Sequence, residues 1–123
     1  MIVAGFGFRR EATLASLRDA LAKAGRAQAI ATVTEKAVTE VFRAFAEETN
    51  LPVTQVSPDK LPEKETATHS HHSENRYRTG SVAEAVALAA AGPGARLIAP
   101  RVVSSDRMAT CALAETNSRG DMS

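Results

Sequence analysis

The stretch that decides the fold is Ile2-Val3-Ala4-Gly5-Phe6-Gly7-Phe8-Arg9-Arg10-Glu11, near the start of the chain. Its apolar first half, residues 2–6, has no helical period and predicts a strand. Beyond it, leucines recur at three- and four-residue spacing until Gly25, which predicts a helix. Gly5 and Gly7 are expected to form a tight turn between the two elements, because glycine lets the backbone turn sharply and approach a ligand closely.

Two adjacent arginines, Arg9 and Arg10, stand between this turn and the helix. The first N–H groups of a helix and its dipole attract negative charge. Paired guanidinium groups hold carboxylate or phosphate through two hydrogen bonds each. Open α/β sheets also bind ligands at the carboxyl ends of their strands. The stretch therefore predicts a site for an acidic ligand, against the alternative that both arginines are ordinary solvated residues.

The next part of the chain has the apolar spacing of a helix, over residues 35–50. Thr34 is placed to act as its N-cap residue, and Val38 is expected on its apolar side. Asn50 tolerates a left-handed backbone conformation, and a proline two residues later prevents continuation, so the helix is expected to end there.

The remaining strands are expected at 29–33, 53–56, 96–103 and 108–114. A capping box of Ser81 and Glu84 predicts the start of another helix, which ends at Gly92. The last two strands are joined by a short polar turn, so they are expected to form an antiparallel pair. Together these elements predict one three-layer α/β/α domain over 1–115 with a mainly parallel central sheet, followed by a frayed polar tail at 116–123.

The composition excludes several classes of protein. Fifteen basic and fourteen acidic side chains leave a net charge of +1, and aromatic residues are 4% of the chain, which argues against nucleic-acid binding. No apolar run approaches the roughly 20 residues that a membrane span needs. The arginines follow the apolar N-terminus, the reverse of a secretory signal. Cys111 is the single cysteine and has apolar neighbours, so that a buried thiol in a cytoplasmic protein is expected.

Two motifs of cofactor and metal binding are incomplete. The glycine turn resembles a dinucleotide fingerprint, but Arg10 stands where that motif has its third glycine. Residues 62–75 have no large apolar side chain and are expected to form a mobile loop. The loop contains His69, His71 and His72, whose spacing fixes no tetrahedral geometry and which no cysteine accompanies. We therefore expect no cofactor and no native metal site, only adventitious metal binding by these histidines.

Lys36 stands at the start of a helix, directly after the second strand, where its charge opposes the helix dipole. If the first two strands are neighbours in a parallel sheet, Lys36 lies at the same edge as Arg9 and Arg10, and the three form a cationic rim. A second candidate anion site is the helix start at Thr79, Gly80 and Ser81, to which Arg101 of the fourth strand adds a charge. Solvated surface charge is the alternative for Lys36 and Arg101.

These segments together resemble the cobalamin-biosynthesis family that comprises CobE and the C-terminal domain of CbiG. The resemblance runs in order over almost the whole chain and is carried by residues 5–10, 31–36, 57–61, 79–85 and 108–114. It implies a standalone three-layer α/β domain, similar to CobE, that acts on corrin-ring precursors. Phe8 stands where many members of the family have cysteine, which excludes a thiol mechanism at that position. Arg101 stands where many have lysine.

The resemblance and the cationic rim imply the same class of ligand. Corrin precursors carry acetate and propionate groups around a large apolar macrocycle, so Arg9, Arg10 and Lys36 would hold carboxylates while Phe8 covers a ring face. The leading hypothesis is an accessory protein that binds a precorrin or hydrogenobyrinic-acid-like intermediate and passes it to other enzymes of the pathway.

Two alternatives stay open. One is a hydrolase or isomerase of the precorrin ring, because CbiG proteins are associated with opening a lactone of cobalt-precorrin-5A. Lys36 or Glu11 would then act as acid or base, although neither has a recognisable orienting partner. CbiG proteins carry an additional N-terminal domain for which this chain has no room. The other alternative is a general α/β module that binds phosphate or a nucleotide.

Overall fold

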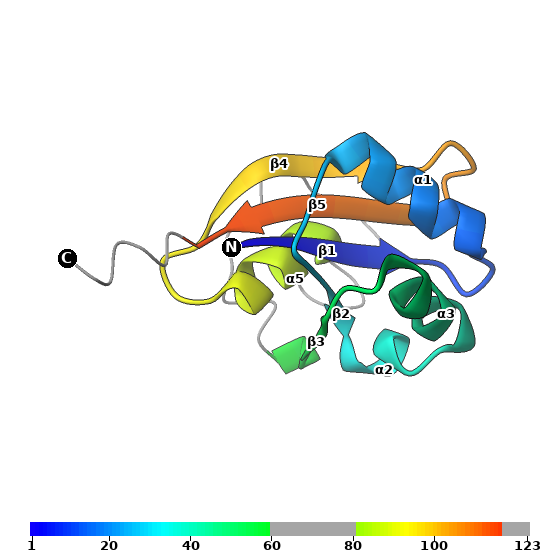
Figure 1. Cartoon of the computed structure of the whole chain (residues 1–123), viewed down its shortest axis with the longest axis horizontal. Coiled ribbons are helices and arrows are strands. Elements are labelled where there is room, and N and C mark those ends of the chain that lie inside the picture. Colours follow the sequence, from blue (N-terminus) through cyan, green and yellow to red (C-terminus); the bar gives the residue numbers. More distant parts are fainter. Residues whose placement is uncertain (60–80, 117–123) are drawn as a thin grey trace.

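The first strand runs straight through both glycines of the opening stretch. In the computed structural model, which describes residues 1–59 and 81–116, β1 spans Ile2–Phe8 (Figure 1). It pairs along its whole length with a distant strand, from Ile2 opposite Glu115 to Phe8 opposite Ala109. The expected glycine turn is therefore wrong: ladder hydrogen bonds from this partner keep the backbone extended. The chain turns only after Phe8, where the N–H of Ala12 donates to the carbonyl of Arg9 at 3.0 Å.

The helix that follows has the expected bounds. Helix α1 spans Leu14–Ala24 and begins with a capping box between Thr13 and Ser16. It ends at Gly25, whose φ of 129° favours glycine. Strand β2, Ala29–Val33, also has the expected bounds, and all of its residues are buried.

The expected single helix over residues 35–50 is divided in two. Helix α2 spans Thr34–Ala37, and α3 spans Glu40–Thr49. Thr34 is not an N-cap residue but the first residue of α2, and its hydroxyl donates to the carbonyl of Val56 at 3.4 Å. The break follows from Thr39, whose hydroxyl bonds the Lys36 carbonyl at 2.6 Å and competes with the helical hydrogen bond. Val38, in the break, is 61% exposed instead of lying on the apolar side.

Helix α3 ends at Asn50, as the sequence indicates. Asn50 has the left-handed conformation, with φ of 58°, and its N–H donates to Ala46. In the part of the chain that the structure describes, the remaining strands are β3 (Val53–Val56), β4 (Arg96–Val103) and β5 (Ala109–Glu115). Their bounds agree with the expected ranges to within one residue.

The sheet is mixed, with the strand order β3-β2-β1-β5-β4. The β1–β2 and β2–β3 pairs are parallel, whereas β5 is antiparallel to both β1 and β4. The expected antiparallel last pair is present, but the expectation of a mainly parallel sheet is wrong, because β5 lies inside the sheet between β1 and β4. Since β5 opposes both neighbours, β4 points the same way as β1. Four strands thus end at one edge, here called the carboxyl edge, at Phe8, Val33, Val56 and Val103. Figure 1 shows β1 and β4 ending on the same side.

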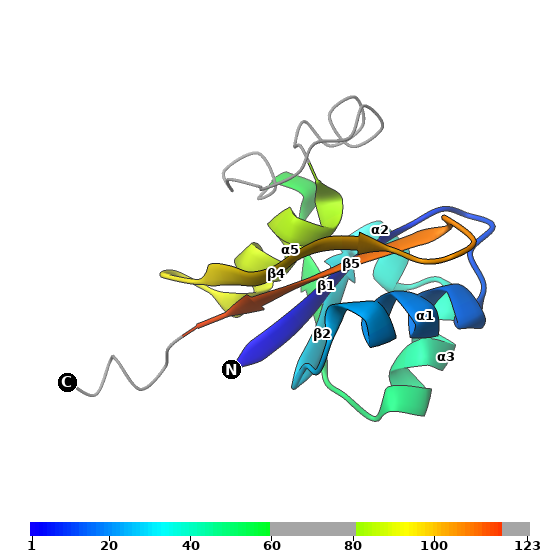
Figure 2. The ribbon, with the colours of Figure 1, turned by 90° about the horizontal axis from the view of Figure 1, so that it is seen from above.

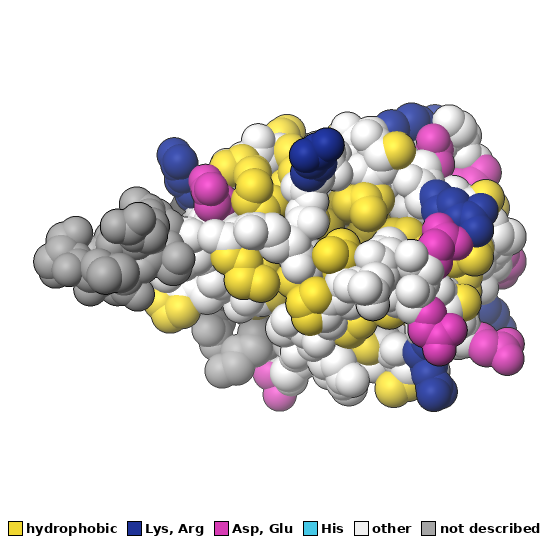
Figure 3. Space-filling model, in the orientation of Figure 1, with side chains coloured by type: hydrophobic (Ala, Val, Ile, Leu, Met, Phe, Trp, Pro, Cys, Tyr) yellow, Lys and Arg dark blue, Asp and Glu magenta, His cyan; other side chains and the backbone are white. Residues whose placement is uncertain are grey.

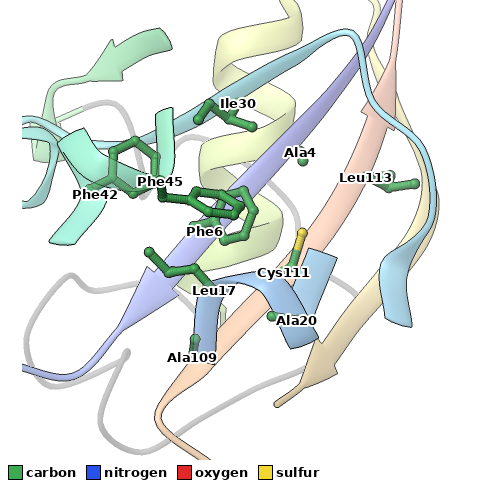
Figure 4. Packing of buried hydrophobic residues seen from close by; sticks show 10 residues of the cluster. All are labelled: Ala4, Phe6, Leu17, Ala20, Ile30, Phe42, Phe45, Ala109, Cys111 and Leu113. Carbon is green, nitrogen blue, oxygen red and sulfur yellow. The ribbon is translucent and has the colours of Figure 1, made fainter. Parts of the chain in front are cut away.

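Helices cover both faces of the sheet (Figure 2). Helices α1 and α3 pack on one face around an aromatic cluster in which Phe6 meets Phe42 and Phe45 edge to face, at 5.9 and 5.3 Å between ring centroids (Figure 4). Helix α5, Val82–Ala91, packs on the other face against small side chains of β1 and β2. It begins at Ser81, whose hydroxyl accepts the N–H of Glu84 as expected, and ends at Gly92.

The two glycines of β1 allow helix α5 to pack closely against the strand. A Cβ on Gly5 would lie 2.4 Å from the carbonyl oxygen of Ala83 and 2.4 Å from the N atom of Ala87, both in the backbone of α5. A Cβ on Gly7 would meet the Thr110 hydroxyl at 3.1 Å. Gly5 is therefore a packing residue under α5, and the structure places it inside the sheet rather than in a loop.

Candidate functional site

An aromatic stack and a lysine meet at the carboxyl edge. The ring of Phe8, the last residue of β1, lies parallel to that of Phe42, with 5.7 Å between centroids and 6° between planes. The Nζ atom of Lys36, in α2, lies 5.1 Å from the centroid of the Phe8 ring. A cation over an aromatic face is attracted by the ring quadrupole. The structure thus brings together Lys36 and Phe8, which the order of strands β1 and β2 places at one edge.

Arg9 and Arg10 lie on the turn that follows, and both are exposed. The N–H of Arg9 donates to the carbonyl of Met108 at 2.8 Å, which ties this turn to the β4–β5 hairpin. Within residues 1–59 and 81–116, neither arginine forms an ion pair. Glu11 is exposed on the same turn. Helix α1 starts only at Leu14, so the arginines do not stand directly at its N-terminus as the sequence indicated.

The helix start that contacts the end of β1 belongs to α5. A Cβ on Gly7 would lie 3.4 Å from the Cβ of Val82, the first residue of α5. The hydroxyl of Thr110 donates to the Gly7 carbonyl at 3.1 Å on the same side. Ser81 is buried at this helix start. The other expected members of this second site, Thr79 and Gly80, lie outside the described residues, as do His69, His71 and His72.

Arg101 approaches the carboxyl edge from β4. It is partly buried, and its backbone N–H donates to Oε2 of Glu84 at 2.8 Å. Glu84 lies in the first turn of α5 and is 0% exposed. The backbone N–H of Arg101 therefore faces α5, whereas the Lys36–Phe8 pair lies on the α3 side of the sheet.

Sequence reasoning missed a further arginine at this edge. Arg107 is exposed in the β4–β5 hairpin, with a left-handed φ of 63°, directly before the residue whose carbonyl accepts the Arg9 N–H. The polar run Ser104-Ser105-Asp106-Arg107 predicts the turn between β4 and β5. Its proximity to Arg9 could not be inferred, because it requires β5 to lie beside β1.

Polar contacts to α1 hold this hairpin in place. Asp106 accepts the hydroxyls of Ser104 and Ser16, each at 2.5 Å, and the N–H of Met108 at 3.0 Å. These hydrogen bonds, led by that of Ser104, lower the pKa of the Asp106 carboxyl. The hairpin is therefore a fixed neighbour of Arg9.

Cys111, the single cysteine of the chain, is buried in β5. Burial raises the pKa of the Cys111 thiol, as expected of a cysteine in an apolar strand. Within residues 1–59 and 81–116, no three His, Cys, Asp or Glu side chains are grouped so that they could hold a metal ion. In the same ranges, none of the helices has the length and apolarity that a bilayer span requires.

An open apolar pocket adjoins the aromatic stack. It has a volume of about 260 Å³, and Phe42 is shared between the pocket and the stack. Its wall consists of Ala37, Val38, Phe42, Arg43, Ala46, Val53 and Gln55. On the face seen in Figure 3, basic and acidic side chains gather toward the end of the molecule where β1 and β4 end. The carboxyl edge thus combines exposed charge with apolar surface.

The sequence of the whole domain matches a known family. The profile of the family described as "Cobalamin synthesis G C-terminus" matches residues 2–114. The chain belongs to this family. It is therefore a cobalamin biosynthesis protein of the CbiG/CobE type, and the family indicated by its sequence motifs is confirmed. A search of curated protein sequences found no significant match.

Solved structures of similar proteins agree with this assignment. The structure of CobE, a protein from the cobalamin (vitamin B12) biosynthetic pathway, is 29% identical with a TM-score of 0.79, over 94% of this chain and 90% of that one. Cobalamin biosynthesis protein chiG from Agrobacterium tumefaciens str. C58 is 30% identical with a TM-score of 0.72, over 95% and 99%.

A third structure shares the fold. It is a cobalamin biosynthesis protein G homologue from Sulfolobus solfataricus, 24% identical with a TM-score of 0.66. The match covers 92% of this chain and 36% of that protein.

Proposed function

We propose that this protein binds a polycarboxylate corrin intermediate of the precorrin or hydrogenobyrinic-acid type at the carboxyl edge. Arg9, Arg10 and Lys36 hold carboxylates at the rim of the ring. The observation that carries the proposal is the Lys36 ammonium 5.1 Å from the Phe8 ring centroid, next to the exposed Arg9–Arg10 pair. Guanidinium groups that lack an ion pair among the described residues can bind carboxylates without first breaking an internal contact.

The apolar part of the site fits the apolar part of the ligand. The parallel rings of Phe8 and Phe42 form a two-ring stack, and the pocket of about 260 Å³ extends from Phe42 toward Val38 and Val53. A macrocycle bearing acetate and propionate groups presents an apolar ring inside a ring of charges. Ligand sites of this kind are lined mainly by apolar side chains, with few polar groups to fix orientation.

The role proposed is to bind the intermediate and pass it to other enzymes of cobalamin biosynthesis. Catalysis by Lys36 or Glu11 is the alternative. No observation favours that alternative: Glu11 is exposed on the turn after β1, and no hydrogen bond orients it among residues 1–59 and 81–116.

The proposal is tested by titrating the protein with hydrogenobyrinic acid and following the absorbance shift and co-elution. Arg9→Ala and Arg10→Ala are each expected to weaken binding by about 1.5 kcal/mol, roughly tenfold, the lower end for a charge-assisted contact because both side chains are exposed before binding. Arg26→Ala is the matched control. Arg26 is exposed at the opposite edge, two residues before Gln28, whose N–H donates to the Ile2 carbonyl at 2.8 Å. Binding by both edge variants as tight as that of the parent would refute the site.

A further inference from the structure

Glu84 is a buried carboxylate that the proposed rim does not use. It is 0% exposed, although it lies in the first turn of α5, close to the carboxyl edge. Burying a carboxylate is unfavourable unless hydrogen bonds replace its water. One such hydrogen bond joins Glu84 to β4: its Oε2 atom accepts the backbone N–H of Arg101 at 2.8 Å. The contact joins a helix on one face of the sheet to a strand within it.

The register of β4 explains why the Arg101 N–H points to a helix. Ala99 pairs with Leu113 of β5, and Val102 pairs with Cys111. Two residues of β4, Pro100 and Arg101, therefore lie opposite a single residue of β5, Ala112. This two-against-one arrangement is a β-bulge, in which the ladder is locally interrupted. The Glu84 carboxylate supplies an acceptor for an N–H that the interrupted ladder does not satisfy.

The bulge lies close to the candidate site. Val103, two residues after Arg101, pairs with Thr110, and Thr110 pairs with Gly7. A Cβ added at Gly7 would in turn lie 3.4 Å from the side chain of Val82, at the start of the helix that carries Glu84. Bulges of this kind re-aim a side chain and occur next to functional sites.

We propose that Glu84 is a positioning residue, which holds the bulge at Pro100–Arg101 so that the Arg101 guanidinium faces the carboxyl edge from the α5 side. Arg101 is then a second carboxylate subsite, opposite the Lys36–Phe8 pair on the α3 side. This inference rests on the proposed function and deepens it. A ligand held from both sides of the sheet must carry carboxylates on more than one side of its ring, which selects polycarboxylate corrinoids.

Four variants test the positioning role, with hydrogenobyrinic acid as the ligand and thermal unfolding measured in parallel. Arg101→Ala is expected to weaken binding about tenfold, as for the loss of one charge-assisted contact. Glu84→Ala is expected to weaken it by the same factor, and the double variant by no more than either single one, because both changes remove the same subsite. Glu84→Gln is expected to retain the affinity, since its amide oxygen accepts the same N–H.

A purely structural role gives a different result. In that case Glu84→Ala lowers the unfolding temperature, but at temperatures well below unfolding it binds the ligand as tightly as the parent. Alternatively, the losses of affinity caused by Glu84→Ala and Arg101→Ala add up in the double variant. Either outcome overturns the inference. If Glu84→Ala does not fold, the affinities of Arg101→Ala and Glu84→Gln are compared with that of the parent. If Arg101→Ala binds as tightly as the parent, Arg101 is not a subsite and the inference is overturned.

A readout on the unaltered protein does not depend on any variant. In a titration with hydrogenobyrinic acid followed by 15N NMR, the backbone N–H and side-chain Nε–H signals of Arg101 are expected to move together with those of Arg9. Arg96 is the matched control on the same strand, since its guanidinium lies 3.5 Å from the Glu115 carboxylate.

The two proposals fail in distinguishable ways. If the Arg9 signals move, or Arg9→Ala weakens binding, while Arg101 is unaffected, the positioning role is overturned and the proposed function stands. If the unaltered protein does not bind, both are overturned.

Discussion

Replacing Gly5 with alanine tests the close packing of α5 on β1. The added Cβ would lie 2.4 Å from Ala83 O and Ala87 N, and 2.8 Å from the Ala87 Cα. All three atoms belong to the backbone of α5, so no side chain can rotate away. To restore an ordinary contact of 3.4 Å, the helix must move by about 1 Å, the difference between 3.4 and 2.4 Å.

The energetic cost follows from that displacement. Helix α5 is buried over most of its length, and moving it loosens its contacts with β1 and β2. Overpacking of this kind costs about 1–3 kcal/mol, and a rigid backbone obstacle places Gly5→Ala at the upper end. Alanine also lowers the conformational entropy of the unfolded chain, which stabilises the folded protein by about 0.4–1 kcal/mol. We expect a net loss of about 2–2.6 kcal/mol in the free energy of unfolding, or roughly 8–10 °C in Tm.

Gly7→Ala is the control, because it makes the same chemical change in the same strand. Its Cβ would meet the Thr110 hydroxyl at 3.1 Å and Val82 side-chain atoms at 3.4 Å, and side chains can adjust. Its loss is expected to stay below about 1 kcal/mol. The assay is urea denaturation followed by circular dichroism, with thermal unfolding in parallel. A Gly5→Ala variant as stable as the parent, or a Gly7→Ala variant as unstable as Gly5→Ala, would refute the reasoning.

Three further predictions concern the core and the hairpin. Because Cys111 is buried and its thiol pKa is raised, iodoacetamide at pH 8 should modify the native protein much more slowly than the urea-unfolded chain, and equal rates would contradict its burial. Hydrogen bonds, led by that of Ser104, lower the pKa of Asp106 below its ordinary 3.8, so the carboxylate stabilises the fold above that pH and the effect is lost as pH falls through the folded-state pKa. Asp106→Asn should therefore be less stable than the parent at pH 7, with a deficit that shrinks below about pH 4 in denaturation curves; a deficit independent of pH would count against this. Phe42→Ala, which empties the centre of the aromatic cluster, should cost about 3–5 kcal/mol by urea denaturation, and a loss under about 1 kcal/mol would show that the cluster is not packed as described.

Local signals in the sequence were sufficient for most element bounds. The strands at 29–33, 53–56 and 96–103 and the helix that ends at Gly25 follow from apolar runs, spacing and a terminating glycine, all read within a few residues. The left-handed conformation of Asn50 at the end of α3 also follows from the residues next to it. The family was also evident from short motifs in chain order.

The joint position of Phe8 and Lys36 followed from one further assumption. Consecutive strands separated by a helix are commonly parallel neighbours, and this alone brings the end of β1 to the start of α2. The same rule could not place Arg107 or β5, because β5 comes last in the sequence and lies between β1 and β4. Its place depends on pairing with β1, which is distant from it in the sequence, and with β4 on its other side.

What only the tertiary structure decided is the role of residues whose partners are distant in the sequence. Gly5 and Gly7 have the local pattern of a turn, yet they lie in a strand because β5 pairs with β1 over its whole length and α5 leaves no room for a side chain at Gly5. Glu84 has the local pattern of a capping residue, yet one of its oxygens accepts the backbone N–H of Arg101 in β4. Propensity and capping act over a few residues, whereas strand pairing, close packing and buried hydrogen bonds depend on what the fold brings near, and here these long-range contacts override the local preference.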